Sequence, residues 1–271
     1  MLRLVLNKFC SREETLSLVL LERPDPEIAV IRMNRPDAMN ALSTPTREEL
    51  AARFEEAMAN DEVRVIVVTG NEEVFVAGAD LKELSTKTTV DWAFSDARRV
   101  WRIIGACPKP IIAAVNGFAL GGGCELALHC DIIVAGEKAK LGLPEISVGV
   151  MPGGGGTQRL TRTIGKYKAM KMMLTGEWVT SQEACDMGMI SEVVADEKVL
   201  DRAMEIARKI SKMPPLSVKL IKEVTLAGMD ASLETGLILE RKAFETLFST
   251  LDQTEGAMAF IEKRKPSFTG N

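Results

Sequence analysis

The chain has 271 residues, of which 46% are hydrophobic and 27% charged, and its formal net charge is −4. These values are typical of a globular protein, and the length allows one large domain with or without a helical appendage. The charge balance provides no basic field for a phosphate polymer, which argues against nucleic acid as the main partner. No apolar run approaches the roughly 18 to 20 residues that cross a bilayer, and Met1 to Cys10 does not resemble a secretory signal.

Cysteine and histidine usage narrows the possible chemistry further. The five cysteines are odd in number and form no C-x-x-C pair, which favours reduced thiols in a reducing, cytoplasmic compartment over disulfides or a zinc site. His129 is the only histidine and lies in an apolar stretch, so we interpret it as a packed or surface residue without a catalytic task. The sequence thus predicts no metal site, and any acid and base catalysis must come from carboxylates.

The first half of the chain alternates strand and helix patterns. Glu27 to Met33 predicts a strand, and Ser43 with Pro45 predicts the capped start of a helix. The apolar face of that helix contains Leu50, Phe54, Ala57 and Met58. Val63 to Thr69 is a continuous apolar run, as found in a sheet that is covered on both faces. Further strands are predicted at 74–77, 111–115 and 131–135, and further helices at 90–106 and 124–130.

After about residue 157 the patterns are almost entirely helical. Helices are predicted at 157–175, 180–188, 197–212, 215–228 and 231–262, with one short strand at 189–194. Strands that alternate with helices indicate an α/β class. We expect a sheet-containing core over residues 1–200 and a helical region over residues 201–271.

Two glycine-containing junctions join a strand to a helix. Gly121 to Gly123 precede a helix whose first turn contains Glu125, and Ala77 to Asp80 precede a second helical start. A tight turn is the structural interpretation of such glycines. The functional alternative is that N–H groups at a helix start bind an anion, and two donors aimed at one oxygen would form an oxyanion hole. Spacing alone leaves open whether the junctions meet.

A third cluster, Gly153 to Gly156, does not match a phosphate-binding loop. It lacks the lysine of the G-x-x-x-x-G-K-[ST] pattern, and the chain contains no G-x-G-x-x-G. Neither a P-loop nor a dinucleotide-binding fold is therefore indicated.

Several ordered motifs resemble the crotonase superfamily of acyl-coenzyme A enzymes, and among them the enoyl-CoA hydratases most closely. The strongest is Lys109 to Glu125, with the sequence KPIIAAVNGFALGGGCE. The others are at 34–42, 77–83, 144–145, 152–160 and 255–264, so that the resemblance covers roughly residues 27 to 268.

The resemblance implies a spiral of repeated strand–strand–helix units with a helical C-terminal region that supports trimers, often paired into hexamers. It implies an acyl-CoA substrate, a place in fatty acid β-oxidation and no cofactor beyond the coenzyme A of the substrate. The N–H groups of Ala79 and Gly122 match the oxyanion hole for the thioester carbonyl. Glu125 and Glu145 match the two glutamates of the hydratases, whereas relatives that isomerise or hydrolyse commonly lack one of them.

Water addition to a conjugated thioester needs a base for the water and an acid for the α-carbon. Two nearby carboxyls can have different protonation states because like charges separate their pKa values. We assign Glu125 as the base and neutral Glu145 as the proton donor. The structural alternatives are a favourable helix N-terminal charge for Glu125 and a solvated loop carboxylate for Glu145.

The resemblance also implies a set of residues that contact coenzyme A or the acyl group. They are Ala38, Ala77, Asp80, Leu81, Lys82, Gly153, Phe260 and Lys263. Lys82 is equally well explained as a solvated helix lysine, and Phe260 and Lys263 are expected from this or a neighbouring subunit. The acyl pocket is expected near 84–100, where Trp92, Phe94 and Trp101 either line it or pack in the core.

Three other functions compete with straight-chain hydration. The nearest is another crotonase reaction, either isomerisation or hydration of a branched or carboxylated group such as methylglutaconyl-CoA. An RNA-binding relative is less well supported because the helix after Pro45 has Glu48, Glu49, Glu55 and Glu56 and no lysine. The presence of both carboxylates argues against a non-catalytic binding protein.

Overall fold

Two β-sheets form the centre of the molecule in a computed structural model that describes residues 17–271. The expectation for Met1 to Cys10 lies outside these residues. The larger sheet has the strand order β1-β2-β3-β5-β7-β10, namely Val19–Asp25, Ile28–Met33, Val65–Thr69, Ile111–Val115, Ile132–Gly136 and Glu192–Val194. The smaller sheet has the order β4-β6-β8-β9, namely Val74–Val76, Phe118–Leu120, Lys140–Gly142 and Val179–Thr180.

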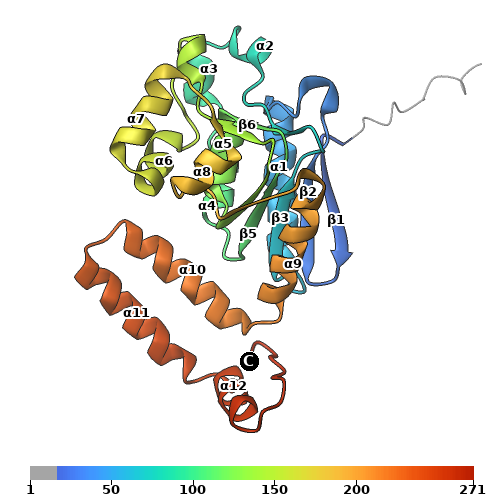
Figure 1. Ribbon diagram of the computed structural model, residues 1–271, viewed down its shortest axis with the longest axis vertical. Coiled ribbons are helices and arrows are strands. Elements are labelled where there is room, and N and C mark those ends of the chain that lie inside the picture. The colour runs from blue at the N-terminus through green and yellow to red at the C-terminus, as the bar shows by residue number, and fades with distance from the viewer. Residues whose placement is uncertain (1–16) are drawn as a thin grey trace, which may run out of the picture.

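From β3 to β8, consecutive strands alternate between the two sheets. β3, β5 and β7 are parallel neighbours in the larger sheet, and β4, β6 and β8 are parallel neighbours in the smaller one. One or more helices follow each pair of strands, so the chain winds as a spiral of strand–strand–helix units (Figure 1). The predicted α/β class and spiral are confirmed.

The larger sheet is covered on both faces, as the continuous apolar run at 63–69 predicts. Alternate side chains of a strand point to opposite faces. Ile66 and Val68 belong to the cluster that contains Phe54 of α1 (Thr44–Ala59). Val65 and Val67 belong to the cluster that includes Ala203 and Met204 of α9 (Val199–Ser211).

Short helices follow the strands and surround the smaller sheet. They are α2 (Leu81–Leu84), α3 (Thr89–Phe94), α4 (Arg99–Gly105), α5 (Gly122–His129), α6 (Gly156–Ile164), α7 (Lys166–Thr175) and α8 (Ser181–Asp186). The single-turn 3-10 elements are η1 (Pro36–Ala38), η2 (Glu145–Val148) and η3 (Asp196–Lys198). Among residues 17–271, no helix combines the length and the apolar composition needed to cross a membrane.

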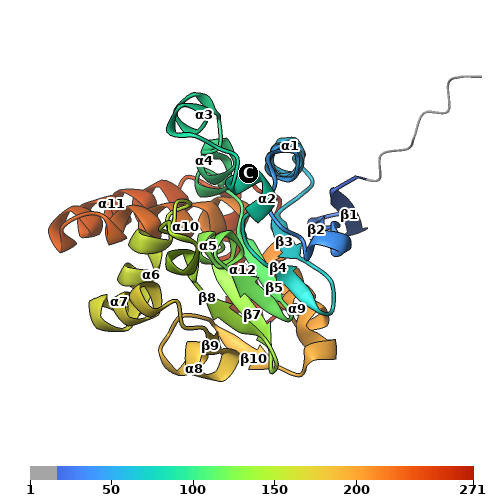
Figure 2. The same cartoon turned by 90° about the horizontal axis from the view of Figure 1, so that it is seen from above.

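The last three helices leave the core. α10 (Pro215–Met229) and α11 (Leu233–Leu247) form a hairpin that extends away from the sheets, followed by α12 (Leu251–Ile261) (Figure 1). Figure 2 shows this hairpin reaching to one side, past α6 and α7. Because α9 still packs on the larger sheet, the packed core extends beyond the expected division at residue 200.

Three of the predicted helical segments are each divided into two helices. The segment 157–175 is divided into α6 and α7 at Gly165. The predicted helix 90–106 is divided into α3 and α4 because Ser95 adopts an extended backbone at the end of α3. The predicted helix 231–262 is divided into α11 and α12 because the Thr250 side chain accepts a hydrogen bond from Gln253 N and starts a new helix. Strands β1, β6, β8 and β9 were not predicted from the sequence. β6 and β8 contain no β-branched residue, unlike the equally short β4 and β10, which were predicted.

Candidate active site

Glu125 is a buried carboxylate in the first turn of α5. Its side chain is 3% exposed, and its Oε1 accepts hydrogen bonds from Gly154 N at 2.7 Å and Gly156 N at 2.8 Å. Burial raises the pKa of Glu125, and the two N–H groups act in the opposite direction because they stabilise the charged form. The two amides thus orient one oxygen and leave Oε2 for other contacts.

Glu145 is the first residue of η2, and its carboxyl group lies next to Gly121, the residue before α5. A Cβ placed on Gly121 would lie 3.3 Å from Glu145 Oε1. Its Oε2 is buried, and no donor within residues 17–271 reaches it. Burial raises the pKa of Glu145 to about 7, and the negative charge of Glu125 adds to the increase. The two carboxyls are therefore electrostatic neighbours, and burial raises the pKa of each.

The two glycine-containing junctions meet beside these carboxyls. A Cβ placed on Gly122 would lie 3.9 Å from Ala79 N, so the two backbone segments are close together. Leu42 lies beside them, because it forms an isolated parallel β-bridge with Ala79. As the first residue of α5, Gly122 has no intrahelical acceptor for its N–H. In the described part of the chain, no hydrogen bond outside the regular elements uses the N–H of Gly122 or Ala79. Two amides are thus available at one position.

Two further residues that were predicted to contact the substrate, Asp80 and Ala77, form hydrogen bonds within the protein. Asp80 caps α2 through hydrogen bonds from Lys82 N and Glu83 N and pairs with Arg35 at 2.8 Å. The Arg35 guanidinium is the main cause of the lowered pKa of Asp80. Ala77 N donates to the backbone, at Met39 O. These contacts show that the Asp80 carboxylate has structural partners of its own.

Four other predicted residues lie at the surface or on a turn. Leu81 is 57% exposed, Lys82 is exposed, and Ala38 ends η1. Gly153 lies ahead of α6, which starts at Gly156, and therefore not at a helix start.

Phe260 and Lys263 are far from Glu125 within one chain. They belong to α12 and the turn after it, at the opposite end of the molecule from α2 and α3 (Figure 1). Phe260 is 87% exposed. A single chain therefore does not bring them to the carboxyls, and only the neighbouring-subunit form of that prediction stays open.

The three aromatic residues that were considered for the acyl pocket have different surroundings in the structure. Trp92 is 41% exposed, with the Arg47 guanidinium 5.7 Å from its ring centroid. Trp101 is partly buried and stacks on His129. The side chain of Phe94 lies outside the described ones.

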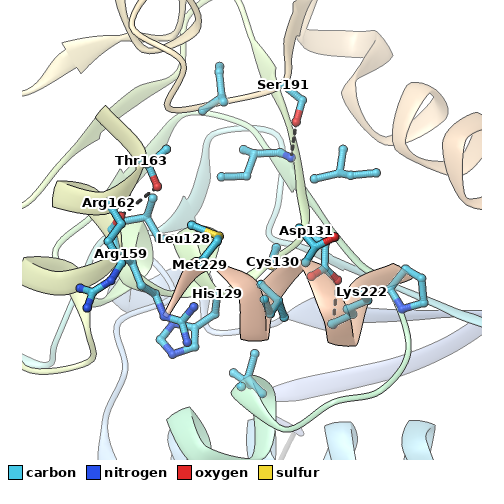
Figure 3. A pocket seen from close by; sticks show the side chains of 18 of the residues that line it. Leu128, His129, Cys130, Asp131, Arg159, Arg162, Thr163, Ser191, Lys222 and Met229 are labelled. Atoms are coloured by element: carbon cyan, nitrogen blue, oxygen red, sulfur yellow. Dashed lines mark hydrogen bonds and ion pairs between the residues drawn. The ribbon is translucent and has the colours of Figure 1, made fainter. Parts of the chain in front are cut away.

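A separate cavity of about 1150 Å³ lies between α10 and the core (Figure 3). Its walls combine apolar side chains such as Leu128 and Met229 with the Lys222–Asp131 ion pair at 2.7 Å. Neither Glu125 nor Glu145 lines it. Nowhere in residues 17–271 do three or more His, Cys, Asp or Glu side chains gather in a way that could hold a metal ion.

Comparison with known proteins identifies the family. The enoyl-CoA hydratase/isomerase family model matches residues 24–271. The chain belongs to the enoyl-CoA hydratase/isomerase family. This confirms the resemblance to the crotonase superfamily and nearly the same span, roughly residues 27 to 268.

Individual family members are similar over almost the whole chain. A probable enoyl-CoA hydratase of Mycobacterium bovis is 43% identical over 94% of this chain and 99% of its own. A 2,3-dehydroadipyl-CoA hydratase of Escherichia coli is 43% identical over 90% and 95%. The crystal structure of an enoyl-CoA hydratase from Bacillus anthracis superposes with a TM-score of 0.89, at 39% identity over 94% and 100% of the two chains.

The residues that hold Glu125 were not predicted from the sequence. The Gly154 and Gly156 amides come from the third glycine cluster, of which only Gly153 was predicted to contact the substrate. The functional signal was present in that cluster, since consecutive glycines allow a backbone to approach a ligand or a side chain closely. Space for a Cβ is in fact lacking at Gly154, where it would lie 2.8 Å from Glu125 Oε2.

Proposed function

We propose that Glu125 and Glu145 together add water to the double bond of a 2-enoyl-CoA thioester, giving a 3-hydroxyacyl-CoA. The chain is a hydro-lyase of the enoyl-CoA hydratase type, as its relatives over most of its length indicate. The observation that supports the residue roles best is the contrast between the two carboxyls. Glu125 accepts two N–H groups, whereas burial raises the pKa of Glu145 to about 7.

In this mechanism Glu125 acts as the base and Glu145 as the acid. The ionised Glu125 takes a proton from water as the oxygen attacks the β-carbon. Neutral Glu145 gives its proton to the α-carbon, and the roles reverse in dehydration. Because the two groups interact, their pKa values belong to the pair.

The N–H groups of Ala79 and Gly122 would hold the thioester oxygen while it gains negative charge. A single donor of this kind is typically worth about 3 to 4 kcal/mol in transition-state stabilisation, compared with about 10² to 10⁴ in rate for a positioned acid or base. A factor of 10² to 10⁴ corresponds to about 3 to 5 kcal/mol, so the two donors together are expected to make the largest single contribution. The remaining substrate contacts are assigned to Ala38, Ala77, Asp80, Leu81 and Lys82 for coenzyme A and its path, and to Gly153 for the water or the acyl group.

The Glu145→Gln variant tests the assignment of the acid. We expect kcat for hydration of crotonyl-CoA to fall by about 10² to 10⁴, with the Kd of a saturated acyl-CoA nearly unchanged. In the wild type, hydration should decrease as the pH rises through about 7, because Glu145 then loses its proton, and this decrease should be absent from the residual activity of the variant. Turnover close to that of the wild type would remove Glu145 from the mechanism.

Hydration of a carboxylated acyl group is the second candidate. It is favoured by the relative named 2,3-dehydroadipyl-CoA hydratase, which is as similar as the probable enoyl-CoA hydratase. Loss of absorbance by the conjugated thioester across a panel of straight, branched and carboxylated enoyl-CoA substrates distinguishes the two. An isomerase would instead move the double bond without forming the 3-hydroxy product.

We further propose a homo-oligomer, either a trimer or a hexamer built from two trimers. Helices α10 to α12 expose large apolar side chains. Five of them, each between 51 and 87% exposed, are Ile221, Leu233, Ile238, Phe244 and Phe260. Contiguous apolar side chains of this kind mark interaction surfaces. In such an assembly Phe260 and Lys263 of one copy would be supplied to the site of another. Size-exclusion chromatography with light scattering tests this state.

The other proposals concern location and requirements. A cytoplasmic location and a role in fatty acid β-oxidation are proposed, as is a reaction that needs no cofactor beyond the coenzyme A of the substrate. The location is supported by Cys107, Cys124, Cys130 and Cys185, which form no disulfide with one another within residues 17–271. Assay of protein treated with a metal chelator tests the requirement for a metal.

A further inference from the structure

The orientation of Glu125 depends on a backbone segment outside its own helix. Both N–H groups that reach the carboxylate belong to residues 154–156, ahead of and at the start of α6. Since both donate to Oε1, the direction in which Oε2 points follows the position of that segment. A displacement of about 1 Å at a catalytic group can cost on the order of 10² in rate, so the support beneath this segment matters for catalysis.

Two aromatic side chains provide that support. A Cβ placed on Gly154 would lie 2.6 Å from Cε2 of Trp101, and one placed on Gly155 would lie 3.4 Å from Cε1 of His129. These short distances mean that the indole and the imidazole lie directly against the glycine backbone. A residue with a side chain at 154 would push the segment off the Trp101 ring.

The two rings also hold each other and the helix of Glu125. Their centroids are 5.2 Å apart with an interplanar angle of 28°. His129 Nδ1 lies 2.9 Å from the carbonyl oxygen of Glu125, so this nitrogen must have the proton. Burial, followed by the charge of Arg159, lowers the pKa of His129 to about 4. The imidazole is therefore neutral near pH 7.

Arg159 completes the surroundings of the imidazole. Figure 3 shows its side chain beside that of His129, at the edge of the cavity next to α10. A Cβ placed on Gly155 would lie 3.5 Å from Arg159 Nε. His129 is thus enclosed by Trp101 from α4, Arg159 from α6 and its own helix α5.

We propose that Trp101 and His129 are positioning residues for Glu125, because their stacked rings support the Gly154–Gly156 backbone that orients the carboxylate. Neither side chain touches the reacting atoms. The inference rests on the proposed role of Glu125 as the base and adds the requirement that its amide partners stay in place. It also gives the only histidine of the chain a task beyond packing.

The experiment compares Trp101→Leu, Trp101→Phe and His129→Phe with the wild type in enoyl-CoA hydration. Trp101→Leu should lower kcat about 10- to 100-fold, and KM should change less than about twofold. Trp101→Phe, which keeps a ring against Gly154, should recover most of the activity. His129→Phe keeps the stacking but loses the hydrogen bond from Nδ1, so a smaller loss of about three- to tenfold is expected. Trp178→Leu, at a tryptophan that packs on Phe118 instead, is the control and should stay within about twofold.

The pH profile separates positioning from a general loss of stability. The amides of Gly154 and Gly156 lower the pKa of Glu125, so a loosened segment should raise this pKa. The acid limb of the kcat/KM profile should therefore move to higher pH in Trp101→Leu and stay in place in Trp178→Leu. Partial unfolding alone would lower the amplitude without moving the limb.

Unchanged kcat and an unmoved acid limb in Trp101→Leu and His129→Phe would overturn the proposal. If the Trp101→Leu protein does not fold, kcat and the acid limb of the pH profile of His129→Phe test the proposal instead. This variant is expected to fold because phenylalanine preserves the volume of the ring. The proposed function is tested separately with Glu125→Gln. An inactive Glu125→Gln protein beside fully active Trp101 and His129 variants would refute only the positioning role.

Discussion

Glu125 and Glu145 are the same kind of residue beside the same pair of free amides, and their surroundings differ. Glu125 is in a helix and accepts two backbone N–H groups, whereas Glu145 begins a 3-10 turn and its buried Oε2 has no donor within residues 17–271. Burial raises the pKa of both. Glu125 accepts two N–H groups from another segment, whereas the backbone hydrogen bond that lowers the pKa of Glu145 comes from its own residue. This difference in surroundings supports the proposed assignment of one glutamate as base and the other as acid.

The largest expected effect is that of Glu125→Gln. The amide oxygen of Gln can still accept from Gly154 and Gly156, so the fold should be kept while the base is lost. We expect kcat for crotonyl-CoA hydration to fall by about 10² to 10⁴, measured by loss of absorbance at the conjugated thioester. Glu72→Gln, at an exposed carboxylate outside the site, is the control. A kcat within a few-fold of wild type would break the contrast between the two acids.

An intermediate effect is expected from Gly154→Ala. The new Cβ would lie 2.6 Å from Trp101 Cε2 and 2.8 Å from Glu125 Oε2, so the segment must shift. A loss of about 10- to 100-fold in kcat is expected, together with about 1 to 3 kcal/mol of unfolding free energy from overpacking. Steady-state kinetics and chemical denaturation measure the two. Gly105→Ala, whose Cβ would meet only Arg159 Nη2 at 3.6 Å, should leave both nearly unchanged.

The smallest effect concerns stability and depends on pH. The pKa of Glu145 is raised in the folded state from 4.5 to about 7, so its contribution to stability is present below pH 4.5 and is lost as the pH rises through about 7. Glu145→Gln removes this loss and should raise the free energy of unfolding at pH 8 by roughly 1 to 3 kcal/mol. Thermal or urea unfolding at pH 8 and pH 4.5 measures the difference. An equal gain at both pH values would mean that ionisation of Glu145 is not its source.

Much of the fold follows from local patterns in the chain. The apolar runs of β3, β5 and β7 and the cap of α1 each arise from neighbouring residues, and the structure confirms them. β6 and β8 were not predicted, whereas the equally short β4 and β10 were, because β6 and β8 contain no β-branched residue that would mark them as strands. Their pairing partners are also distant in sequence. The division of 90–106 into α3 and α4 was missed because a single extended residue, Ser95, ends the first helix.

The sequence by itself determined the family, the α/β class and the two glutamates, because long ordered motifs and residue types are properties of the chain. Only the tertiary structure brought the Ala79 and Gly122 amides together and showed that Gly154 and Gly156 hold Glu125. It also placed α12, the helix that contains Phe260, at the opposite end of the molecule from α2 and α3 (Figure 1). Backbone donors contribute no side chain to a motif, and their convergence depends on how the spiral stacks one turn on the next.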